Sequence, residues 1–168
     1  MTPDRCRTGR PSGLAPVVGN NPRVLILGSY PSVQSLAKRE YYGNPHNQFW
    51  TIVERIYGID RSLPYASRTA RLTGCRVALW DVLASCTRKG SADATIRATV
   101  PNDIAGFLEG HPTVRCIALN GTTAGRFFAS ETCPIPAVVL PSTSPANARL
   151  PLDEKIRIWN NCLSEYLR

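Results

Sequence analysis

Four short apolar runs punctuate the chain, and each is bounded by residues that favour turns. The first run, Val24 to Leu27, contains β-branched residues and is followed by Gly28 and Ser29. A run of this length and composition is typical of a buried strand. We therefore predict strands at residues 24–27, 76–82, 114–119 and 137–140.

Between these runs, apolar residues recur at the spacing of an amphipathic helix. After Pro45 the recurring positions are Phe49, Ile52, Val53 and Ile56. Proline is favoured in the first turn of a helix, so we predict a helix that begins at Pro45 and carries Asn47 and Phe49 in its opening turn. Further helices are predicted at residues 63–72, 101–109, 122–129 and 152–167. The polar segment 85–100 is predicted to be a loop.

Strands that alternate with helices favour an α/β fold with a parallel sheet covered on both faces. At 168 residues the chain is long enough for one domain with a sizeable core. Residues 1–21 are rich in Arg, Pro, Gly and Asn and show no periodicity. We therefore expect a flexible basic tail over residues 1–21 and a single domain over residues 22–168.

The predicted strands end in polar or small residues. These are Gly28 and Ser29, Asp81, Asn120 and Gly121, and Ser142 and Thr143. Because ligands of open parallel sheets bind at the carboxyl ends of the strands, these residues are expected to line one edge and one site. No chemical role is assigned to Asp81.

One segment concentrates flat rings with amide and imidazole groups. Its members are Tyr41, Tyr42, Asn44, His46, Asn47, Gln48, Phe49 and Trp50. Such a cluster suits recognition of a planar heterocycle by stacking and by hydrogen bonds to its edge. Taken alone, Asn47 is more typical of a helix cap than of a catalyst, and Phe49 fits either the core or a pocket.

Composition narrows the choice of partner and of chemistry. The formal net charge of +8 favours nucleic acid, although a merely basic protein would share it. The chain has no phosphate-binding loop, dinucleotide fingerprint or nucleophile elbow. Two histidines and six cysteines without metal-type spacing predict no metal site and reduced thiols. No apolar run could span a bilayer and no secretory signal is present, so a cytoplasmic, prokaryotic-type intracellular protein is expected.

Four segments together carry a specific resemblance. They are residues 28–36, 41–50, 78–91 and 141–147, with the sequence Tyr-Tyr-Gly-Asn-Pro-His-Asn-Gln-Phe-Trp at 41–50 as the most specific. On these segments the chain resembles the uracil-DNA glycosylase superfamily, and most closely its hypoxanthine-DNA (deoxyinosine) glycosylase family. The resemblance implies a three-layer α/β/α sandwich around a mainly parallel four-stranded sheet. It also implies a monofunctional enzyme of base-excision repair that needs no cofactor.

The implied reaction is hydrolysis of the N-glycosidic bond of a deaminated base, most closely hypoxanthine, after base flipping. The implied substrate is double-stranded DNA that contains deaminated bases, and a monomer is expected. A glycosylase for uracil, xanthine or mismatches, and a non-catalytic module that binds damaged DNA, are the alternatives.

The resemblance also implies roles for individual residues. Uracil-specific branches place Asp or Asn where this chain has Tyr30, so the group that positions water is expected at Asn47 instead, with Asn44 as the fallback. Uracil enzymes open their closing motif with histidine, where this chain has Ser142. The residues expected to bind the base are Gly28, Ser29, Tyr30, Phe49 and Asn120. The residues expected to contact DNA as a wedge are Ser142, Thr143, Ser144, Pro145 and Asn147.

Overall fold

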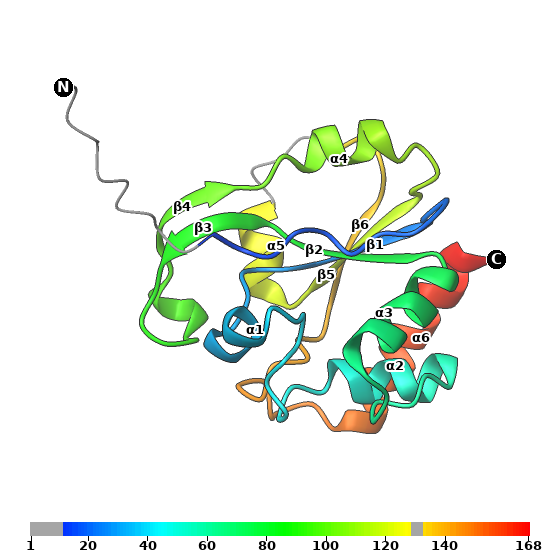
Figure 1. Cartoon of the computed structure of the whole chain (residues 1–168), viewed down its shortest axis with the longest axis horizontal. Coiled ribbons are helices and arrows are strands. Elements are labelled where there is room, and N and C mark those ends of the chain that lie inside the picture. The colour runs from blue at the N-terminus through cyan, green and yellow to red at the C-terminus, as the bar shows by residue number, and fades with distance from the viewer. Residues whose placement is uncertain (1–11, 129–132) are drawn as a thin grey trace.

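The computed structural model describes residues 12–128 and 133–168. Its centre is a four-stranded sheet with the order β2-β1-β5-β6, in which every neighbouring pair of strands is parallel (Figure 1). The strands are β1 (Val24–Gly28), β2 (Val77–Asp81), β5 (Cys116–Asn120) and β6 (Ala137–Leu140). Each apolar run that predicted a strand forms one, and the predicted α/β class is confirmed.

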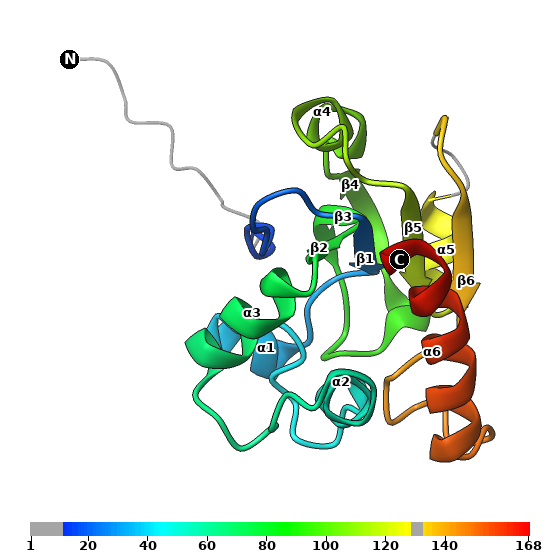
Figure 2. The same cartoon turned by 90° about the vertical axis from the view of Figure 1, so that its right-hand side faces the viewer.

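Helices cover both faces of this sheet. They are α1 (Val33–Lys38), α2 (Phe49–Tyr57), α3 (Tyr65–Gly74), α4 (Ile104–Gly110), α5 (Thr122–Phe128) and α6 (Leu152–Leu167). Buried residues of α2, α3 and α6 pack on one face, and those of α4 and α5 pack on the other (Figure 2). The predicted three-layer sandwich is therefore confirmed. Ala129, the predicted last residue of the fifth helix, lies outside the described residues.

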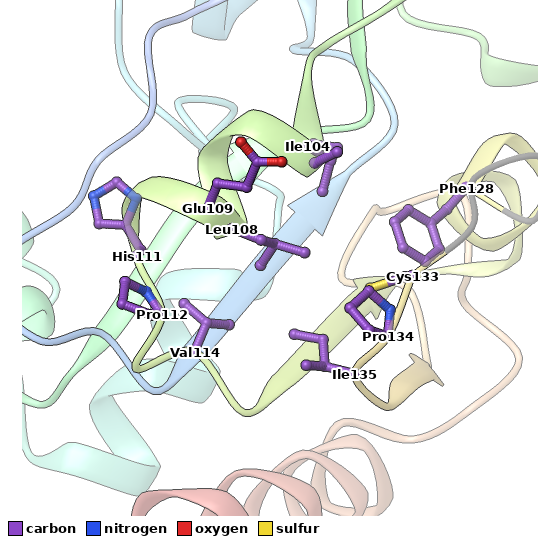
Figure 3. Close-up of a pocket in the computed structure, with 11 residues that line it drawn as sticks. Ile104, Leu108, Glu109, His111, Pro112, Val114, Phe128, Cys133, Pro134 and Ile135 are labelled. Atoms are coloured by element: carbon purple, nitrogen blue, oxygen red, sulfur yellow. The ribbon is translucent and has the colours of Figure 1, made fainter.

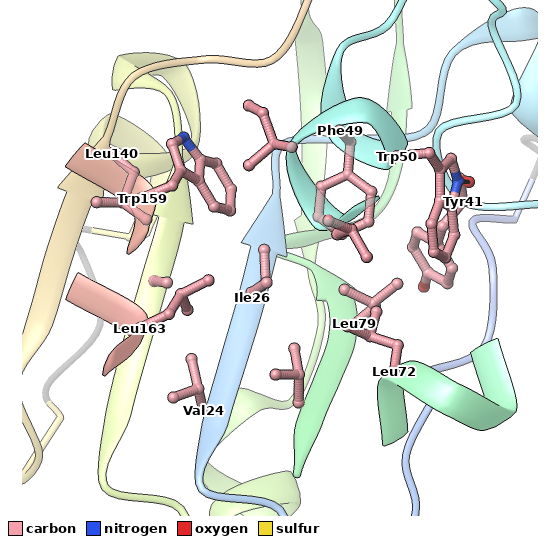
Figure 4. Packing of buried hydrophobic residues seen from close by; sticks show 14 of the residues in the cluster. Val24, Ile26, Tyr41, Phe49, Trp50, Leu72, Leu79, Leu140, Trp159 and Leu163 are labelled. Carbon is pink, nitrogen blue, oxygen red and sulfur yellow. Dashed lines mark hydrogen bonds between the residues drawn. The ribbon is translucent and has the colours of Figure 1, made fainter. Parts of the chain in front are cut away.

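The two-residue period of a strand explains the two cores. Along β1, Val24 and Ile26 face the layer of α2 and α6, whereas Leu25 and Leu27 face α4 and α5. All five residues of β1 are buried. Figure 4 shows Val24 and Ile26 beneath the aromatic side chains of the first layer. Each buried Val, Leu or Ile side chain contributes about 1.5–3 kcal/mol to folding, so β1 anchors the molecule.

The predicted loop at residues 85–100 is wrong. β3 (Leu83–Thr87) and β4 (Arg97–Pro101) pair antiparallel, and the short 3-10 helix η1 (Asp93–Thr95) lies between them. Every residue of β4 is exposed, so the strand lacks the alternation of apolar and polar positions that would have indicated it. Backbone hydrogen bonds to β3 hold it in place. We call residues 83–101 the ribbon.

The expected flexible tail also needs correction. Residues 1–11 lie outside the described residues, but Val17 forms an antiparallel bridge with Leu79 of β2, with two N–O distances of 2.8 Å. The amide of Gly13 donates to the carbonyl of Ala84 at 2.8 Å. Residues 13–17 therefore pack against the domain, whose boundary lies before residue 22. Backbone pairing of this kind requires no side-chain periodicity.

Helix α2 begins later than predicted. The amide of Asn47 donates to the carbonyl of Asn44 at 2.9 Å, which closes a turn around Pro45, and Phe49 is the first helical residue. At the other end Gly58 adopts a φ of 69° and its amide donates to the carbonyl of Glu54. Asn47 therefore precedes the helix, at the carboxyl edge of the sheet.

Candidate active site

The ends of the parallel strands bring three polar or small positions into one row. Gly28 of β1 lies opposite Asp81 of β2, and the pairing of β1 with β5 places Asn120 on its other side. Because side chains alternate along a strand, all three positions face the layer of α2, α3 and α6. This row at the carboxyl edge is the floor of the candidate site.

Gly28 allows the Asp81 carboxyl to turn across β1. A Cβ atom at residue 28 would lie 2.6 Å from Oδ1 of Asp81 and 3.6 Å from the hydroxyl of Tyr42. The first distance is far below a van der Waals contact, so any larger residue at 28 would displace the carboxyl. Gly28 thus shapes the candidate site through the absence of a side chain.

Asp81 is a buried acid without full hydrogen bonding. It is only 4% exposed, and its Oδ2 has no hydrogen-bond partner among the described residues. Burial raises the pKa of Asp81 to about 7, with a further rise from Asp93 and an opposing effect from Arg88. The carboxyl is therefore largely neutral below pH 7, which is unusual for aspartate.

Asn120 holds the neighbouring segments together. Its Oδ1 accepts a hydrogen bond from the amide of Thr143 at 3.0 Å. Its Nδ2 donates to Oγ1 of Thr143 at 2.9 Å and to the hydroxyl of Tyr42 at 3.2 Å. Both ends of the carboxamide are thus engaged within the protein. The predicted contact of Asn120 with a base would have to compete with these bonds.

Two stacked aromatic rings lie at this edge, one from the partly buried Tyr42 and one from the fully buried Phe49. Phe49 is fully buried, with its ring centroid 3.9 Å from that of Tyr42 in a stacked arrangement. Trp50 and Trp159 pack edge-on against Phe49 (Figure 4). Phe49 is therefore a core residue, and stacking of a base on its ring does not fit this position. The apolar face of the amphipathic helix α2 carries it inward.

Tyr42 is only partly buried, and its backbone is strained. Its φ of 57° lies in the left-handed region, which costs a non-glycine residue about 1–2 kcal/mol. Stacking on Phe49 and the hydroxyl contact with Asn120 hold it there. The sequence pattern included Tyr42 in the aromatic cluster but did not distinguish its role, because no periodicity separates a site ring from a core ring.

Asn47 lies one residue before Gln48, the N-cap residue of α2, at the edge of the candidate site. Its Oδ1 accepts a hydrogen bond from the amide of Phe49 at 2.9 Å. Oδ1 of the fallback residue, Asn44, accepts from the amide of His46 at 3.0 Å within the turn at Pro45. The next residue after Asn47, Gln48, donates its amide to the carbonyl of Thr143 at 2.9 Å. The predicted catalytic segment and the predicted wedge segment are therefore joined directly.

Residues of the ribbon contact Ser29 and Tyr30. Oγ of Ser29 donates to Oδ2 of Asp93 at 3.0 Å, and the guanidinium of Arg88 lies 5.1 Å from the centre of the Tyr30 ring. Arg88 and Asp93 form an ion pair at 3.6 Å. Tyr30 is 7% exposed, and burial raises the pKa of its hydroxyl. These contacts fix the backbone just after β1, while little of the Tyr30 ring is open to a ligand.

The predicted wedge, residues 142–147, is a tightly bonded loop. The amide of Asn147 donates to the carbonyl of Ser144 at 3.0 Å, and its Nδ2 donates to the carbonyl of Ser142 at 3.2 Å. Thr143 is fully buried and serves as the anchor to Asn120. Pro145 is exposed at the tip. The loop thus has a base that is held by hydrogen bonds and an exposed tip.

A buried lysine ties this loop to α2. Lys155 of α6 is 1% exposed, and its Nζ donates to Oε1 of Gln48 at 2.8 Å and to the carbonyl of Asn147 at 2.7 Å. Burial lowers the pKa of Lys155. Lys155 was not among the residues predicted for the site. The sequence feature that could have predicted its burial is its position four residues before Trp159, because this spacing places both residues on the inward face of α6.

Other features lie away from this edge. An apolar hollow of about 280 Å³ separates α4 from the residues before β6, and it is lined by Leu108, Val114 and Ile135 among others (Figure 3). It lies towards the amino ends of β5 and β6. Among residues 12–128 and 133–168, no cluster of His, Cys, Asp or Glu could hold a metal ion. In the same residues no helix combines the length and apolarity needed to cross a membrane.

Comparison with known proteins agrees with the resemblance seen in the sequence. Residues 16–162 match the family model of the uracil DNA glycosylase superfamily. A protein from Methanosarcina acetivorans named hypoxanthine DNA glycosylase is 38% identical over 144 residues, which cover 82% of this chain and 88% of that protein. A protein of the same name from Methanosarcina barkeri is 34% identical over 116 residues, which cover 68% and 73% of the two chains.

A solved structure has the same fold. It is a solution NMR structure from Methanosarcina acetivorans, described as that of a candidate uracil DNA glycosylase. It superposes with a TM-score of 0.81 at 34% identity and covers 94% of this chain and 98% of its own. The family match, the relatives and the shared three-layer fold lead to one conclusion: the chain belongs to the uracil DNA glycosylase superfamily.

Proposed function

We propose that this member of the superfamily is a DNA glycosylase that removes hypoxanthine from deoxyinosine in double-stranded DNA. The relatives named hypoxanthine DNA glycosylase support this substrate. The observation that carries the proposal is the 2.9 Å hydrogen bond from Gln48 to Thr143, since it joins the Asn47 segment to the loop 142–147. A water-positioning amide and a DNA wedge thus share one edge. We expect the protein to act as a monomer.

Base flipping is the first step of the proposed reaction. Extruding a base costs a few kcal/mol of lost stacking and pairing, and a mismatched inosine lowers that cost. The exposed tip of the loop at Pro145 occupies the vacated position, and the bonds of Asn147 keep the loop rigid. Tyr42, half-buried at the edge of the site, offers the stacking surface first assigned to Phe49.

Hydrolysis then occurs at the anomeric carbon. The bond from C1′ to N9 breaks, its electron pair leaves with the base, and the sugar develops oxocarbenium character. Oδ1 of Asn47 has two lone pairs, of which the amide of Phe49 uses one. The second accepts a hydrogen bond from a water and directs its oxygen to C1′. An amide is a poor base, so this role is positioning, and the water proton passes to solvent or to the departing base.

Two departures from the uracil enzymes favour hypoxanthine over uracil. Tyr30 stands where uracil-specific branches carry Asp or Asn, and its ring is held beneath Arg88. Ser142 stands where those enzymes carry histidine, so no imidazole is available there to stabilise a departing uracil anion.

The test compares four duplexes that carry a single deoxyinosine, deoxyuridine, deoxyxanthosine or a normal base. Each is incubated with the protein under single-turnover conditions and treated with alkali, which breaks the strand at an abasic site. We expect strand breaks with the fastest rate at deoxyinosine. Fastest cleavage at deoxyuridine or deoxyxanthosine would overturn the assignment of hypoxanthine. Tight binding without breaks at any lesion would instead indicate a damage-binding module.

A further inference from the structure

Three arginines gather at the amino edge of the sheet, the edge opposite the candidate active site. Each stands immediately before a strand: Arg23 before β1, Arg76 before β2 and Arg115 before β5. β1 lies between β2 and β5, and the first residues of the three strands pair in register, so the three arginines are neighbours across the sheet. The amide of Arg23 donates to the carbonyl of Arg76 at 2.8 Å, and the amide of Arg115 donates to the carbonyl of Arg23 at 2.7 Å. This edge lies beside the end of α6 (Figure 1).

The three side chains border a hollow of about 320 Å³. We call it the arginine hollow, and its lining residues are Asn21, Arg23, Arg76, Pro112, Thr113 and Arg115. Its volume lies in the range of small-ligand sites, but such sites are mostly apolar, whereas half of these lining residues are cationic. The chemistry of the hollow therefore suits an anion.

The positive charges of the arginine hollow lack carboxylate partners. In residues 12–128 and 133–168, no Asp or Glu side chain forms an ion pair with Arg23, Arg76 or Arg115. One guanidinium N–H of Arg23 donates to the main-chain oxygen of Arg168, which leaves its other donors available. Desolvation lowers the pKa of Arg23, and the charges of Arg115 and Arg76 lower it further. An anion in the hollow would relieve this repulsion.

Arg76 completes the hollow from an unfavourable backbone conformation. It follows Cys75, the C-cap residue of α3, and its φ of 64° lies in the left-handed region. Glycine is the residue usually found at this position after a helix, because a Cβ atom makes the left-handed conformation unfavourable. The backbone alone would therefore favour glycine here, and the sequence places a guanidinium instead.

We propose that the arginine hollow binds a phosphate group. A guanidinium presents parallel N–H donors that fit two oxygens of a phosphate, and three guanidiniums can engage several oxygens and match its charge. A carboxylate has two oxygens and a single charge, so it would leave donors unused. The phosphate belongs either to the backbone of a nucleic acid or to a free anion, and the test distinguishes these sources. The hollow lies at the opposite edge from Asn47, so this inference goes beyond the proposed function and does not depend on it.

The first arm of the test adds orthophosphate to the full-length protein. NMR spectra follow the backbone amides at constant ionic strength, with chloride as the reference anion. We expect saturable shifts of the amides of Arg23, Arg76 and Arg115, and none at Asn47. Chloride should produce no saturable shift, because it lacks the several oxygens that the guanidiniums engage.

Arg76→Gly removes one guanidinium without straining the fold. Glycine adopts the left-handed conformation readily, so this variant is expected to fold, and an unfolding curve checks that it does. Orthophosphate should bind it about tenfold or more weakly, as the loss of one charge-assisted contact requires. Arg39→Gly is the matched control, because Arg39 is an exposed arginine with a φ of 56° at the C-cap of α1. It lies outside the arginine hollow and should bind orthophosphate as the wild type does.

The second arm uses undamaged duplex DNA and identifies the source of the phosphate. If the hollow holds a backbone phosphate, the duplex shifts the same three amides. Arg76→Gly then reduces the slope of log affinity against log salt concentration by about one. If the hollow holds a free anion, orthophosphate shifts these amides and the duplex does not. Either result supports a phosphate site.

Three results would overturn it. They are the absence of saturable shifts at the hollow with both probes, equal shifts with chloride, and equal weakening of orthophosphate binding by Arg76→Gly and Arg39→Gly. Base excision enters none of these measurements, so a failure of the proposed function leaves the outcome of this test unchanged.

Discussion

At the scale of single residues, the carboxyl edge separates polar groups that are satisfied from one that is not. Asn120 and Thr143 bond to each other, and Asn47 bonds to the start of α2. Asp81 keeps an unpaired buried oxygen. Satisfied groups rigidify a site, while an unpaired one is open to a ligand. The sequence predicted these positions at one edge but could not show which of them would already be bonded.

The stability of the protein should therefore depend on pH through Asp81. Its pKa rises from about 3.9 in an unfolded chain to about 7 in the folded protein, so the stabilising contribution is complete at low pH and is lost as the pH rises through 7. Asp81→Asn removes this loss and should raise the free energy of unfolding at pH 8 by up to about 4 kcal/mol. Urea unfolding of the wild type and of Asp81→Asn at pH 5 and at pH 8 measures this difference in the free energy of unfolding. If the free energies of unfolding of the two proteins differed equally at pH 5 and pH 8, the raised pKa of Asp81 would be contradicted.

At the scale of elements, α6 holds the segments at the carboxyl edge of the sheet through hydrogen bonds from two of its side chains. Trp159 of α6 donates from Nε1 to the carbonyl of Pro141 at 2.9 Å, just before the loop 142–147. Lys155 joins the same loop to the start of α2. The helix therefore sets the distance between Asn47 and the wedge loop, although it contributes no group to the reaction.

Lys155→Met tests this support. The substitution keeps the length of the side chain but leaves the Gln48 and Asn147 oxygens without their donor. We expect a loss of about 1–3 kcal/mol in the free energy of unfolding. Excision from deoxyinosine should fall by about tenfold or more, since the wedge and the water-positioning group lose their fixed spacing.

Arg157→Met on the same helix is the matched control. Arg157 is largely exposed and pairs with Glu154 on the surface, so its removal should leave both the free energy of unfolding and excision nearly unaltered. Equal effects of the two substitutions on excision, measured at a temperature where both variants are folded, would remove Lys155 from its supporting role.

At the scale of the whole molecule, the architecture was predictable where burial follows a period. The central strands are short and apolar, and α6 begins and ends at the predicted residues. The ribbon and residues 13–17 were not predictable, because backbone pairing holds them and their side chains follow no period. For the site, the convergence of strand ends was predictable. The burial of Phe49 and the internal bonds of Asn120 were not, since they depend on packing between distant segments.

We place the water-positioning group on Asn47, nineteen residues after Gly28, rather than just after β1. The most direct test is single-turnover release of hypoxanthine from a deoxyinosine duplex by Asn47→Ala, with Asn44→Ala as the control. Both variants lose a side-chain bond to a backbone amide, which costs about 1 kcal/mol of stability. We predict that Asn47→Ala binds the duplex as the wild type does but releases the base at least about a hundredfold more slowly, while Asn44→Ala remains near the wild type. Release near the wild-type rate by Asn47→Ala, or an equal loss in both variants, would show that Asn47 does not position the water.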